Sequence, residues 1–303
     1  MSANHIRRLA IIGGTHGNEF TGAYLVKKLK RFPNLVKRSS FETITLLANP
    51  QAFAVARRYV DRDLNRCFSI KDLGNPQCSS YEDKQAKVIH QVLAAEENSK
   101  VDAIFDLHST TANMGLTIIP VSDRPFNLQL AAYLSSIDPT IKVYQWQQSH
   151  DRCFLRSRFE LGLTIEVGPI AQGVLNAWFF EQTEKLLCMI LDYIDAHNRG
   201  QAPTVPSQLT IYRCTEMIDY PRDEEGIQAM IHPELQFKDY APLNPGDPLF
   251  LNFEGKTIFY EGESTVYPVF INEAAYYEKG IAVCLTKKEQ IPIKSFTQLE
   301  KSF

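Results

Sequence analysis

Two side chains with metal-binding chemistry stand three residues apart near the start of the chain. Residues 13–19 have the sequence Gly-Gly-Thr-His-Gly-Asn-Glu and follow directly on the apolar run 9–12, so His16 and Glu19 are expected where a buried strand ends. Zn²⁺ prefers imidazole nitrogen and carboxylate oxygen donors within about 2.0–2.2 Å of one point. The three glycines allow a sharp turn and a close approach to a metal or ligand. This segment predicts two zinc ligands, although the H-x-x-E spacing alone also arises by chance.

A third ligand is predicted at the end of the apolar run 101–108. A catalytic zinc binds three protein ligands and leaves the fourth position to water, and His108 again stands where a strand is expected to end. Side chains alternate in direction along a strand, so Asp106 and His108 lean to the same side, where the carboxylate could fix the imidazole tautomer. An isolated His at a strand end is commonly only a satisfied polar residue. Its assignment as a ligand therefore depends on His16 and Glu19.

Length and composition are those of a soluble globular enzyme. The chain of 303 residues is long enough for one large or two moderate domains. It contains 44% hydrophobic and 22% charged residues and has a formal net charge of −3, without the basic excess of a nucleic-acid-binding protein. We therefore expect no nucleic-acid partner, and any attraction for anions must be local.

No feature of the sequence predicts export or membrane insertion. There is no apolar run of about eighteen residues, the length that spans a bilayer, and the first residues contain no signal-peptide apolar region. The six cysteines are scattered without a C-x-x-C pair, which favours reduced thiols. We expect a cytoplasmic protein with no membrane partner.

Over the first two-thirds of the chain, β-type apolar runs alternate with amphipathic stretches. This pattern is typical of an α/β fold with largely buried strands. The expected strands are 7–13, 42–48, 101–108, 116–120, 141–146 and 161–167. The expected helices are 19–32, 80–96, 126–136 and 176–198.

The character of the chain then changes. Residues 201–207 are polar and contain two prolines, a composition typical of a linker. Beyond them, turn signals such as Asn-Pro-Gly-Asp-Pro at 244–248 separate short β-type runs such as 209–212. We predict a catalytic domain over residues 1–200 and a smaller, mainly β domain over residues 201–303.

A basic segment could recognise carboxylates. Residues 57–66, with the sequence Arg-Arg-Tyr-Val-Asp-Arg-Asp-Leu-Asn-Arg, carry arginine and asparagine donors, and a guanidinium binds a carboxylate through a planar fork. Asp61 and Asp63 could orient these guanidinium groups. A solvated basic loop is the alternative when the segment is considered alone.

One acid interrupts an apolar strand near its end. Residues 161–169 have the sequence Leu-Gly-Leu-Thr-Ile-Glu-Val-Gly-Pro, and a carboxylate at Glu166 is disfavoured there without a partner. A general base beside a zinc-bound water would explain its position. A salt-bridged structural glutamate explains it equally well.

Together these motifs closely resemble those of the aspartoacylase and aminoacylase-3 branch of the zinc carboxypeptidase-like hydrolases. The matching segments occur in the same order and cover nearly the whole chain. They are residues 13–19, 63–66, 106–108, 166–169, 219–223, 232–233, 244–248 and 267–279. Such a set is far more specific than a metal triad, which many hydrolases share.

The resemblance implies a carboxypeptidase-like mixed-sheet N-terminal domain and a smaller, mainly β C-terminal domain that covers the active-site mouth. It implies one zinc ion per chain, held by His16, Glu19 and His108. A homodimer is suggested on the same grounds. The implied substrate contacts are Arg58, Asn65, Arg66, Arg156, Glu166 and Tyr276.

The implied activity is hydrolysis of the amide bond of an N-acyl amino acid, the reaction of a zinc amidohydrolase acting on linear amides. Zinc would lower the pKa of its bound water, Glu166 would act as general base and then as general acid, and Arg58 would help to polarise the acetyl carbonyl. With Asn65, Arg66 and Arg156 holding its carboxylates, the expected substrate is N-acetyl-L-aspartate, which yields acetate and L-aspartate. The expected partner is thus a small dicarboxylate molecule.

Two departures from the family pattern leave the substrate open. Ser109 follows the third ligand where mammalian relatives have Asn, and Arg152 stands where a substrate-contacting Tyr is expected. Aminoacylases for acetylated aromatic or S-substituted cysteine derivatives share most of these motifs, and more distant desuccinylases act on succinylated glutamate. A metallocarboxypeptidase and a non-catalytic zinc-binding protein are alternatives of a different class. Fe²⁺ or Co²⁺ could also occupy the same donors.

Overall fold

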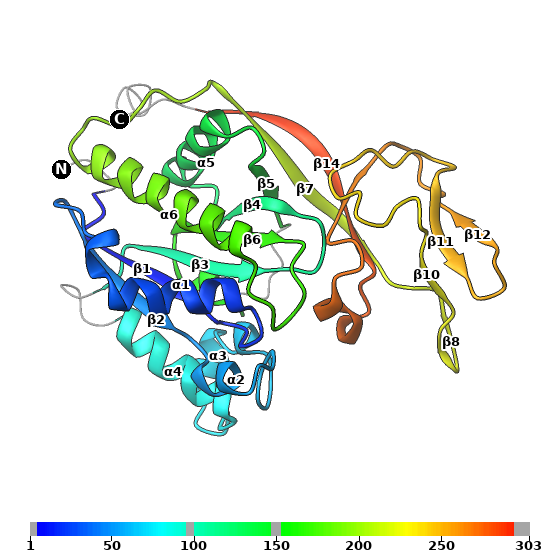
Figure 1. The fold of residues 1–303 in the computed structure, drawn as a ribbon, viewed down its shortest axis with the longest axis horizontal. Helices are drawn as coiled ribbons and strands as arrows, with labels where there is room; N and C mark the ends of the chain where they lie inside the picture. The colour runs from blue at the N-terminus through cyan, green and yellow to red at the C-terminus, as the bar shows by residue number, and fades with distance from the viewer. Residues whose placement is uncertain (1–4, 95–99, 147–152, 294–303) are drawn as a thin grey trace.

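The computed structural model describes residues 5–94, 100–146 and 153–293. Figure 1 shows a larger lobe, in which helices flank a central sheet, and a smaller lobe of short strands at the far end of two long strands.

The larger lobe alternates strands with helices, as the apolar periodicity predicts. Its strands are β1 (Arg8–Gly13), β2 (Glu42–Leu47), β3 (Ala103–Ser109), β4 (Gly115–Pro120), β5 (Lys142–Gln145) and β6 (Leu161–Gly168). Its long helices are α1 (Phe20–Arg31), α4 (Tyr81–Leu93), α5 (Pro125–Ile137) and α6 (Ala177–Asn198). Each expected element is confirmed, with small differences at its ends. The short helices η1 (Pro33–Leu35), α2 (Pro50–Ala54) and α3 (Ile70–Gly74) were not predicted, because they are too short to show a helical period.

The C-terminal third is built mainly from strands, as predicted. The two long strands are β7 (Gln208–Ile218) and β14 (Val283–Pro292), which pair antiparallel, and β13 (Tyr267–Val269) pairs with β14. The smaller lobe contains a sheet of β10 (Ala229–Ile231), β11 (Pro248–Asn252) and β12 (Thr257–Phe259) and a hairpin of β8 (Arg222–Asp223) and β9 (Gly226–Ile227). The strand β14 was not predicted, because its second half, Lys-Lys-Glu-Gln at 287–290, has the composition of an exposed loop.

One nine-stranded sheet extends from the larger lobe towards the smaller one. Its order is β13-β14-β7-β5-β4-β6-β3-β1-β2. The strands β2, β1, β3 and β6 are parallel, whereas β4 is antiparallel to β6, which confirms the mixed sheet. The strand β7 pairs with β5 at the start of the C-terminal third, so β7 and β14 continue the same sheet and carry the smaller lobe (Figure 1).

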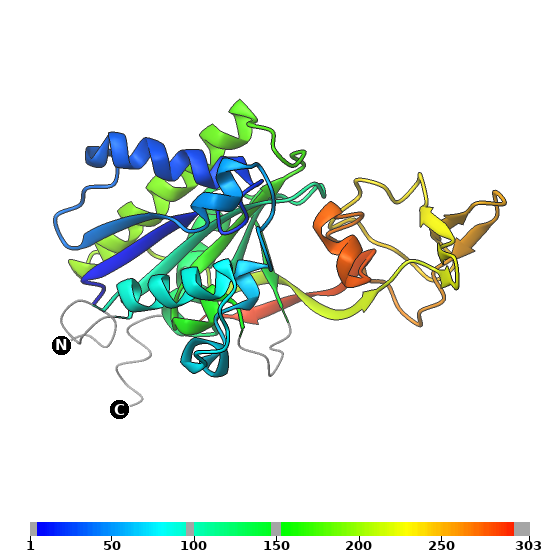
Figure 2. The same cartoon turned by 90° about the horizontal axis from the view of Figure 1, so that it is seen from below.

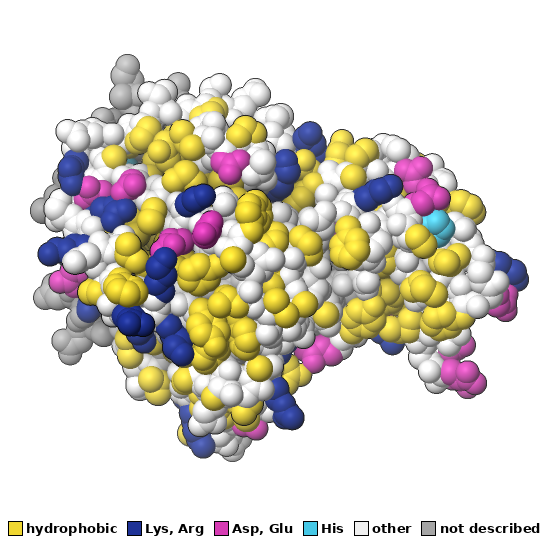
Figure 3. All heavy atoms as spheres, viewed as in Figure 1, with side chains coloured by type: hydrophobic (Ala, Val, Ile, Leu, Met, Phe, Trp, Pro, Cys, Tyr) yellow, Lys and Arg dark blue, Asp and Glu magenta, His cyan; other side chains and the backbone are white. Residues whose placement is uncertain are grey.

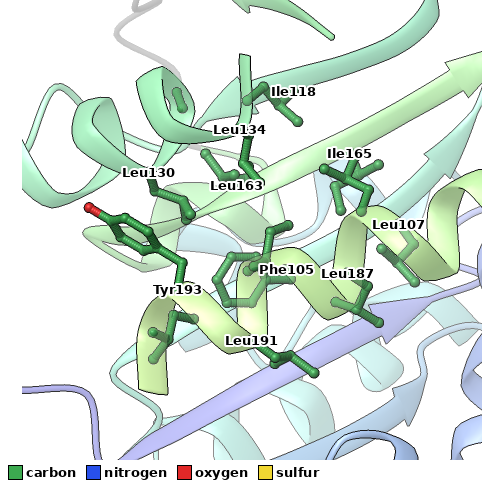
Figure 4. Close-up of a cluster of buried hydrophobic side chains, with 14 of the residues drawn as sticks. Phe105, Leu107, Ile118, Leu130, Leu134, Leu163, Ile165, Leu187, Leu191 and Tyr193 are labelled. Carbon is green, nitrogen blue, oxygen red and sulfur yellow. The ribbon is translucent and has the colours of Figure 1, made fainter. Parts of the chain in front are cut away.

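Apolar side chains pack against both faces of this sheet. Ile11 of β1 belongs to the core formed with α1, α5 and α6, whereas the next residue, Ile12, belongs to the core formed with α4. Figure 4 shows the first core, in which Phe105 of β3 clusters with Leu187 and Leu191 of α6. Figure 2 shows helices on the two sides of the sheet. The strands are therefore buried on both faces, as their apolar sequences predict.

This alternation decides where the polar end of β3 points. Ile104 packs on the α4 side of the sheet, and side chains two residues apart share a face. Asp106 and His108 therefore lie on that side as well, at the carboxyl end of the strand. The fold thus delivers a histidine and a carboxylate to one edge of the sheet.

The surface carries charges of both signs. Figure 3 shows Lys and Arg side chains interspersed with Asp and Glu on the face that it presents. This mixture agrees with the formal net charge of −3. Among residues 5–94, 100–146 and 153–293, no helix has both the length and the apolar character needed to cross a bilayer.

A buried glutamate fixes the loop of residues 57–66. Glu82 lies in the first turn of α4 and is fully buried. Its carboxylate accepts the side-chain N–H of Asn49 at 3.1 Å and the backbone N–H groups of residues 60, 61 and 62 at 2.7, 3.0 and 3.2 Å. One carboxylate from α4 therefore sets the path of the segment that carries the predicted carboxylate-binding arginines.

Replacing Glu82 by Gln is expected to lower the free energy of unfolding by about 2–3 kcal/mol, because the amide turns an N–H₂ group against donors that now lack an acceptor. Urea unfolding measures the change. The matched variant Glu181→Gln, at an exposed position of α6, should stay within about 0.5 kcal/mol of the unchanged protein. An equally small effect of Glu82→Gln would show that the loop does not depend on this carboxylate.

Candidate active site

Three side chains with metal-ligand chemistry meet at the carboxyl edge of β1 and β3. His16 and Glu19 lie between β1 and α1, and His108 lies near the end of β3. Their ligand atoms are all within 4.8 Å of one another, and all three residues are buried. Nδ1 of His16 is 2.6 Å from Oε1 of Glu19, and Nδ1 of His108 is 2.9 Å from Oε2. Two imidazole nitrogens and a carboxylate form a donor set that fits Zn²⁺ with an open fourth position.

The two histidines keep Glu19 ionised. Burial raises the pKa of this carboxyl, but the combined effect of His16 and His108 in the opposite direction is larger. The net pKa of Glu19 therefore lies well below its usual value. Arg58 adds a bond from its Nη1 to Oε1 of Glu19 at 3.2 Å. Glu19 is therefore ionised, as a carboxylate ligand must be.

Each histidine is held from behind by a second carboxylate. Nε2 of His16 donates to Oδ1 of Asp63 at 3.0 Å, and Nε2 of His108 donates to Oδ2 of Asp106 at 2.9 Å. This arrangement fixes the tautomer and leaves the Nδ1 lone pair of each ring for a metal. The contact of Asp106 with His108 confirms the expectation from strand alternation. The contact of Asp63 with His16 was missed, because no spacing rule connects a loop residue to a histidine 47 positions earlier.

Glycines allow the loop of His16 to pass close to the loop of Arg58. Gly14 has a φ of +68°, in the left-handed region that favours glycine. A Cβ at Gly17 would lie 2.2 Å from the backbone carbon of Ala52, so only glycine fits there. With this close approach, the backbone N–H of Gly17 donates to the carbonyl of Arg58 at 3.1 Å.

Glu166 faces the same region from the neighbouring strand. It stands opposite His108 in the register of β3 and β6. No hydrogen bond joins its carboxyl to another residue of the described chain, so the salt-bridged structural role is not observed. Burial raises the pKa of Glu166 to about 8. The strand thus presents an unpaired carboxyl group beside the three candidate ligands.

These groups line one cavity of about 640 Å³, a volume that includes its open mouth. The structure places every predicted metal ligand and substrate contact on its wall, namely His16, Glu19, Arg58, Asn65, Arg66, His108, Arg156, Glu166 and Tyr276. The remaining wall is largely apolar and includes Ile119, Tyr144, Trp146, Phe154 and Phe270.

The arginines of the cavity differ in their partners. Arg58 binds Asp63 at 3.3 Å as well as Glu19, whereas Arg66 and Arg156 form no ion pair with any carboxylate of the described residues. Their guanidinium carbons lie 4.4 and 5.0 Å from the centre of the Phe154 ring. Burial lowers the pKa of Arg156, as expected for a cation without a neutralising anion. Two guanidinium groups are therefore free to bind an anionic ligand.

Asn65 joins these arginine-bearing segments. Its Oδ1 accepts the backbone N–H of Leu155 at 2.9 Å, at the start of η3 (Leu155–Arg158). Asn65 itself belongs to η2 (Leu64–Arg66), next to Arg66. Its side chain thus fixes the position of Arg156 relative to Arg66, in addition to lining the cavity.

The C-terminal third contributes part of the wall through η4 (Ala274–Lys279) and the residue before it (Figure 1). Glu273 accepts the backbone N–H groups of Thr111 and Ala112 at 2.7 and 3.3 Å, and the hydroxyl group of Thr110 also bonds to it. Tyr276 lies on the cavity wall. Glu273 was missed as a site residue, although an acid two positions after the apolar run 268–271 could have drawn attention to it.

The two departures from the family pattern have different outcomes. The backbone N–H of Ser109 donates to Oε2 of Glu19 at 3.1 Å, a contact that an asparagine at this position would also make. Arg152 lies outside the described residues.

Comparison with known proteins assigns the family. Residues 5–194 match the family model described as the succinylglutamate desuccinylase/aspartoacylase catalytic domain, and residues 207–288 match the AstE/AspA barrel-sandwich hybrid domain. The chain belongs to the succinylglutamate desuccinylase/aspartoacylase family. The resemblance found in the sequence motifs is thereby confirmed.

Relatives in this family carry names with different substrates. A protein of Nostoc sp. named probable aspartoacylase is 57% identical, over 95% of this chain and 98% of its own. A human protein named N-acyl-aromatic-L-amino acid amidohydrolase (carboxylate-forming) is 42% identical, over 93% of this chain and 91% of its own. The crystal structure of murine aminoacylase 3 matches with a TM-score of 0.90 and 38% identity, over 97% of this chain and 98% of that chain. The family is therefore clear, whereas the substrate must be argued from the cavity.

The change Asp106→Asn is expected to weaken zinc binding by roughly tenfold or more, because a neutral amide replaces the anion behind His108. Competition with a chromogenic chelator measures the zinc dissociation constant. Asp102→Asn is a matched control at the opposite end of β3, where Asp102 binds the backbone of Arg7 and Arg8, and should leave the constant unchanged. Equal zinc affinity of the two variants would refute the role of Asp106.

Proposed function

We propose that this protein is a zinc-dependent deacylase of N-acyl amino acids, with N-acetyl-L-aspartate as substrate and acetate and L-aspartate as products. The observation that carries this proposal is the unpaired Glu166 in the cavity that also contains His16, Glu19 and His108. A carboxyl group with a raised pKa and no structural partner is suited to proton transfer.

Glu166 is assigned both proton transfers of the reaction. Zinc bound by the three ligands would lower the pKa of a coordinated water and polarise the acyl carbonyl. Glu166 removes a proton from the attacking water as the C–O bond forms. It then donates this proton to the amide nitrogen, so that the C–N bond breaks and the amino acid leaves with a neutral amine. A pKa of about 8 suits a group that accepts and returns a proton near neutral pH.

Guanidinium groups match the charges of the substrate. Arg58 is held by Glu19 and Asp63 beside the metal ligands, where it stabilises the negative charge that develops on the acyl oxygen. Arg66 and Arg156 are available for the two carboxylates of the aspartyl group. Tyr276 and Asn65, on the same wall, complete the set of proposed substrate contacts.

An N-acyl aromatic amino acid is the second candidate substrate, and the apolar wall of the cavity favours it. A substrate ring could pack against Trp146, Tyr144 and Phe270, while one guanidinium group binds the α-carboxylate. The human relative at 42% identity is named for aromatic substrates. This alternative keeps the same reaction and changes only the side chain of the amino acid.

Proposals of a different class have less support. A carboxypeptidase needs a cleft that is open to a peptide chain, whereas Glu273 and Tyr276 of the C-terminal third form part of this cavity wall. A zinc-binding protein without turnover would not explain the unpaired carboxyl group of Glu166 in the cavity. A cytoplasmic location and a homodimer stay predictions from the sequence.

Glu166→Gln is expected to lower kcat by roughly 10²- to 10⁴-fold, because an amide cannot accept the proton of the water. The zinc content should stay near that of the unchanged protein, since Glu166 is not a ligand. Release of L-aspartate and metal analysis measure the two quantities. The exposed Glu160→Gln, just before β6, is the control, and comparable kcat values for both variants would remove Glu166 from the mechanism.

Of three substrates, N-acetyl-L-aspartate is expected to give the highest kcat/KM, because its two carboxylates match the two guanidinium groups of Arg66 and Arg156, with no third carboxylate to accommodate. N-acetyl-L-tyrosine and N-succinyl-L-glutamate complete the panel. A preference for N-acetyl-L-tyrosine would replace the proposed substrate by the second candidate. Zinc binding without hydrolysis of any of the three would contradict the proposed enzymatic function itself.

A further inference from the structure

A lysine of the C-terminal third contacts the carboxylate that supports a candidate metal ligand. Lys279, the last residue of η4, places its Nζ 3.1 Å from Oδ2 of Asp63. The other oxygen of Asp63 is the one that holds His16. In Figures 1 and 2, η4 lies between the two lobes, on the side of the smaller lobe that faces the larger one. The carboxylate of Asp63 therefore connects η4 to a candidate metal ligand.

This contact is made in spite of an unfavourable electrostatic setting. Only 20% of the Lys279 side chain is exposed, and burial, together with Arg58 and Arg66, lowers its pKa. Three cations thus share one small region, which is destabilising unless each is well paired. A lysine side chain is rarely buried unless it is paired with an anion.

Charge balance alone does not require Lys279. Asp63 already bonds to His16, to Nη2 of Arg58 at 3.3 Å and to the backbone N–H of Asn65 at 2.9 Å. These contacts all come from the larger lobe. Lys279 adds the one described contact of Asp63 that comes from the C-terminal third, so it links the position of that third to the orientation of the carboxylate.

We propose that Lys279 is a positioning residue that fixes Asp63 and, through Asp63, holds His16 in the orientation that binds the metal. The metal centre is then complete only when η4 is seated against the loop of residues 57–66. This inference rests on the zinc site of the proposed function.

A neighbouring contact provides a matched control. The hydroxyl group of Tyr59 donates to Oε2 of Glu278 at 2.7 Å, so it joins the same two segments one residue away from Lys279. Among the described residues, no hydrogen bond joins the Tyr59 side chain to Asp63 or to a candidate ligand. Loss of this bond tests whether any link between the segments suffices, or whether the link to Asp63 is needed.

The sign of the effect separates positioning from simple charge. If Lys279 acted only as a cation near a divalent metal ion, its removal would relieve repulsion and tighten metal binding. If it holds Asp63 in place, its removal frees the carboxylate and loosens His16, and metal binding weakens. The two explanations therefore predict opposite changes of the same measured quantity.

The experiment measures zinc transfer from the zinc-loaded, full-length chain to a chromogenic chelator. Lys279→Met should lose zinc roughly tenfold faster than the unchanged protein, at the lower end of the effect of an outer-shell partner. Lys279→Arg, which keeps the charge and the donor, should restore slow release, and Tyr59→Phe should leave it unchanged. In an Asp63→Asn background, Lys279→Met should add little, because its effect acts through Asp63.

Each other result overturns the inference. If Lys279→Met released zinc as slowly as the unchanged protein, or more slowly, Lys279 would not position Asp63. If Tyr59→Phe released zinc as fast as Lys279→Met, the Lys279 contact would be no more specific than the other contact between the two segments. If Lys279→Met does not fold, Lys279→Ala, which also removes the donor, carries the same expectation and the same test. Failure of the unchanged protein to bind zinc would instead refute the proposed function, so the two failures are distinguishable.

Discussion

Imidazole rings held from behind by buried carboxylates are the interaction on which the rest of this site depends. Nδ1 of His16 and Nδ1 of His108 approach the two oxygens of Glu19 only because Asp63 and Asp106 occupy the opposite ring nitrogens. A metal site tolerates ligand displacements of only a few tenths of an ångström. The rings must therefore be fixed before a metal arrives, and a buried carboxylate can fix them only if its own remaining contacts are satisfied.

The need to satisfy these carboxylates draws distant segments to one place. Asp106 accepts the hydroxyl group of Thr15, from the loop that carries His16, at 2.8 Å. Glu82 sets the backbone of residues 60–62, and Glu273 binds the backbone just beyond His108 from the C-terminal third. Each acid is paired with N–H or O–H donors of another segment, which is how buried charge becomes tolerable. Glu166 is the exception, because no donor of the described residues pairs with its carboxyl group. This lack of a structural partner is why we assign it to proton transfer.

The sequence allowed prediction wherever the information is local. The apolar periodicity predicted the strands and long helices of the larger lobe, and strand alternation placed Asp106 behind His108. The sequence could not predict contacts that depend on how loops meet. Asp63 contacts His16 across 47 residues of the chain, and Lys279 contacts Asp63 across 216 residues. Neither spacing nor hydropathy encodes such distances. The strand β14 was missed for a related reason, since its charged half is stabilised by pairing with β7 and not by burial.

The pairing of charges also bears on the choice between the two candidate substrates. Arg66 and Arg156 are like charges that both lie against Phe154, and the ring gives each guanidinium group a favourable contact without neutralising it. A ligand with two carboxylates would supply an anion to each guanidinium group through charge-assisted hydrogen bonds. A ligand with an aromatic side chain would gain contact with the apolar wall but would leave one half-buried guanidinium group without an anion while covering it from water, which is costly. The unpaired arginines therefore favour a dicarboxylate substrate, and the apolar wall then serves to exclude water and strengthen these ion pairs.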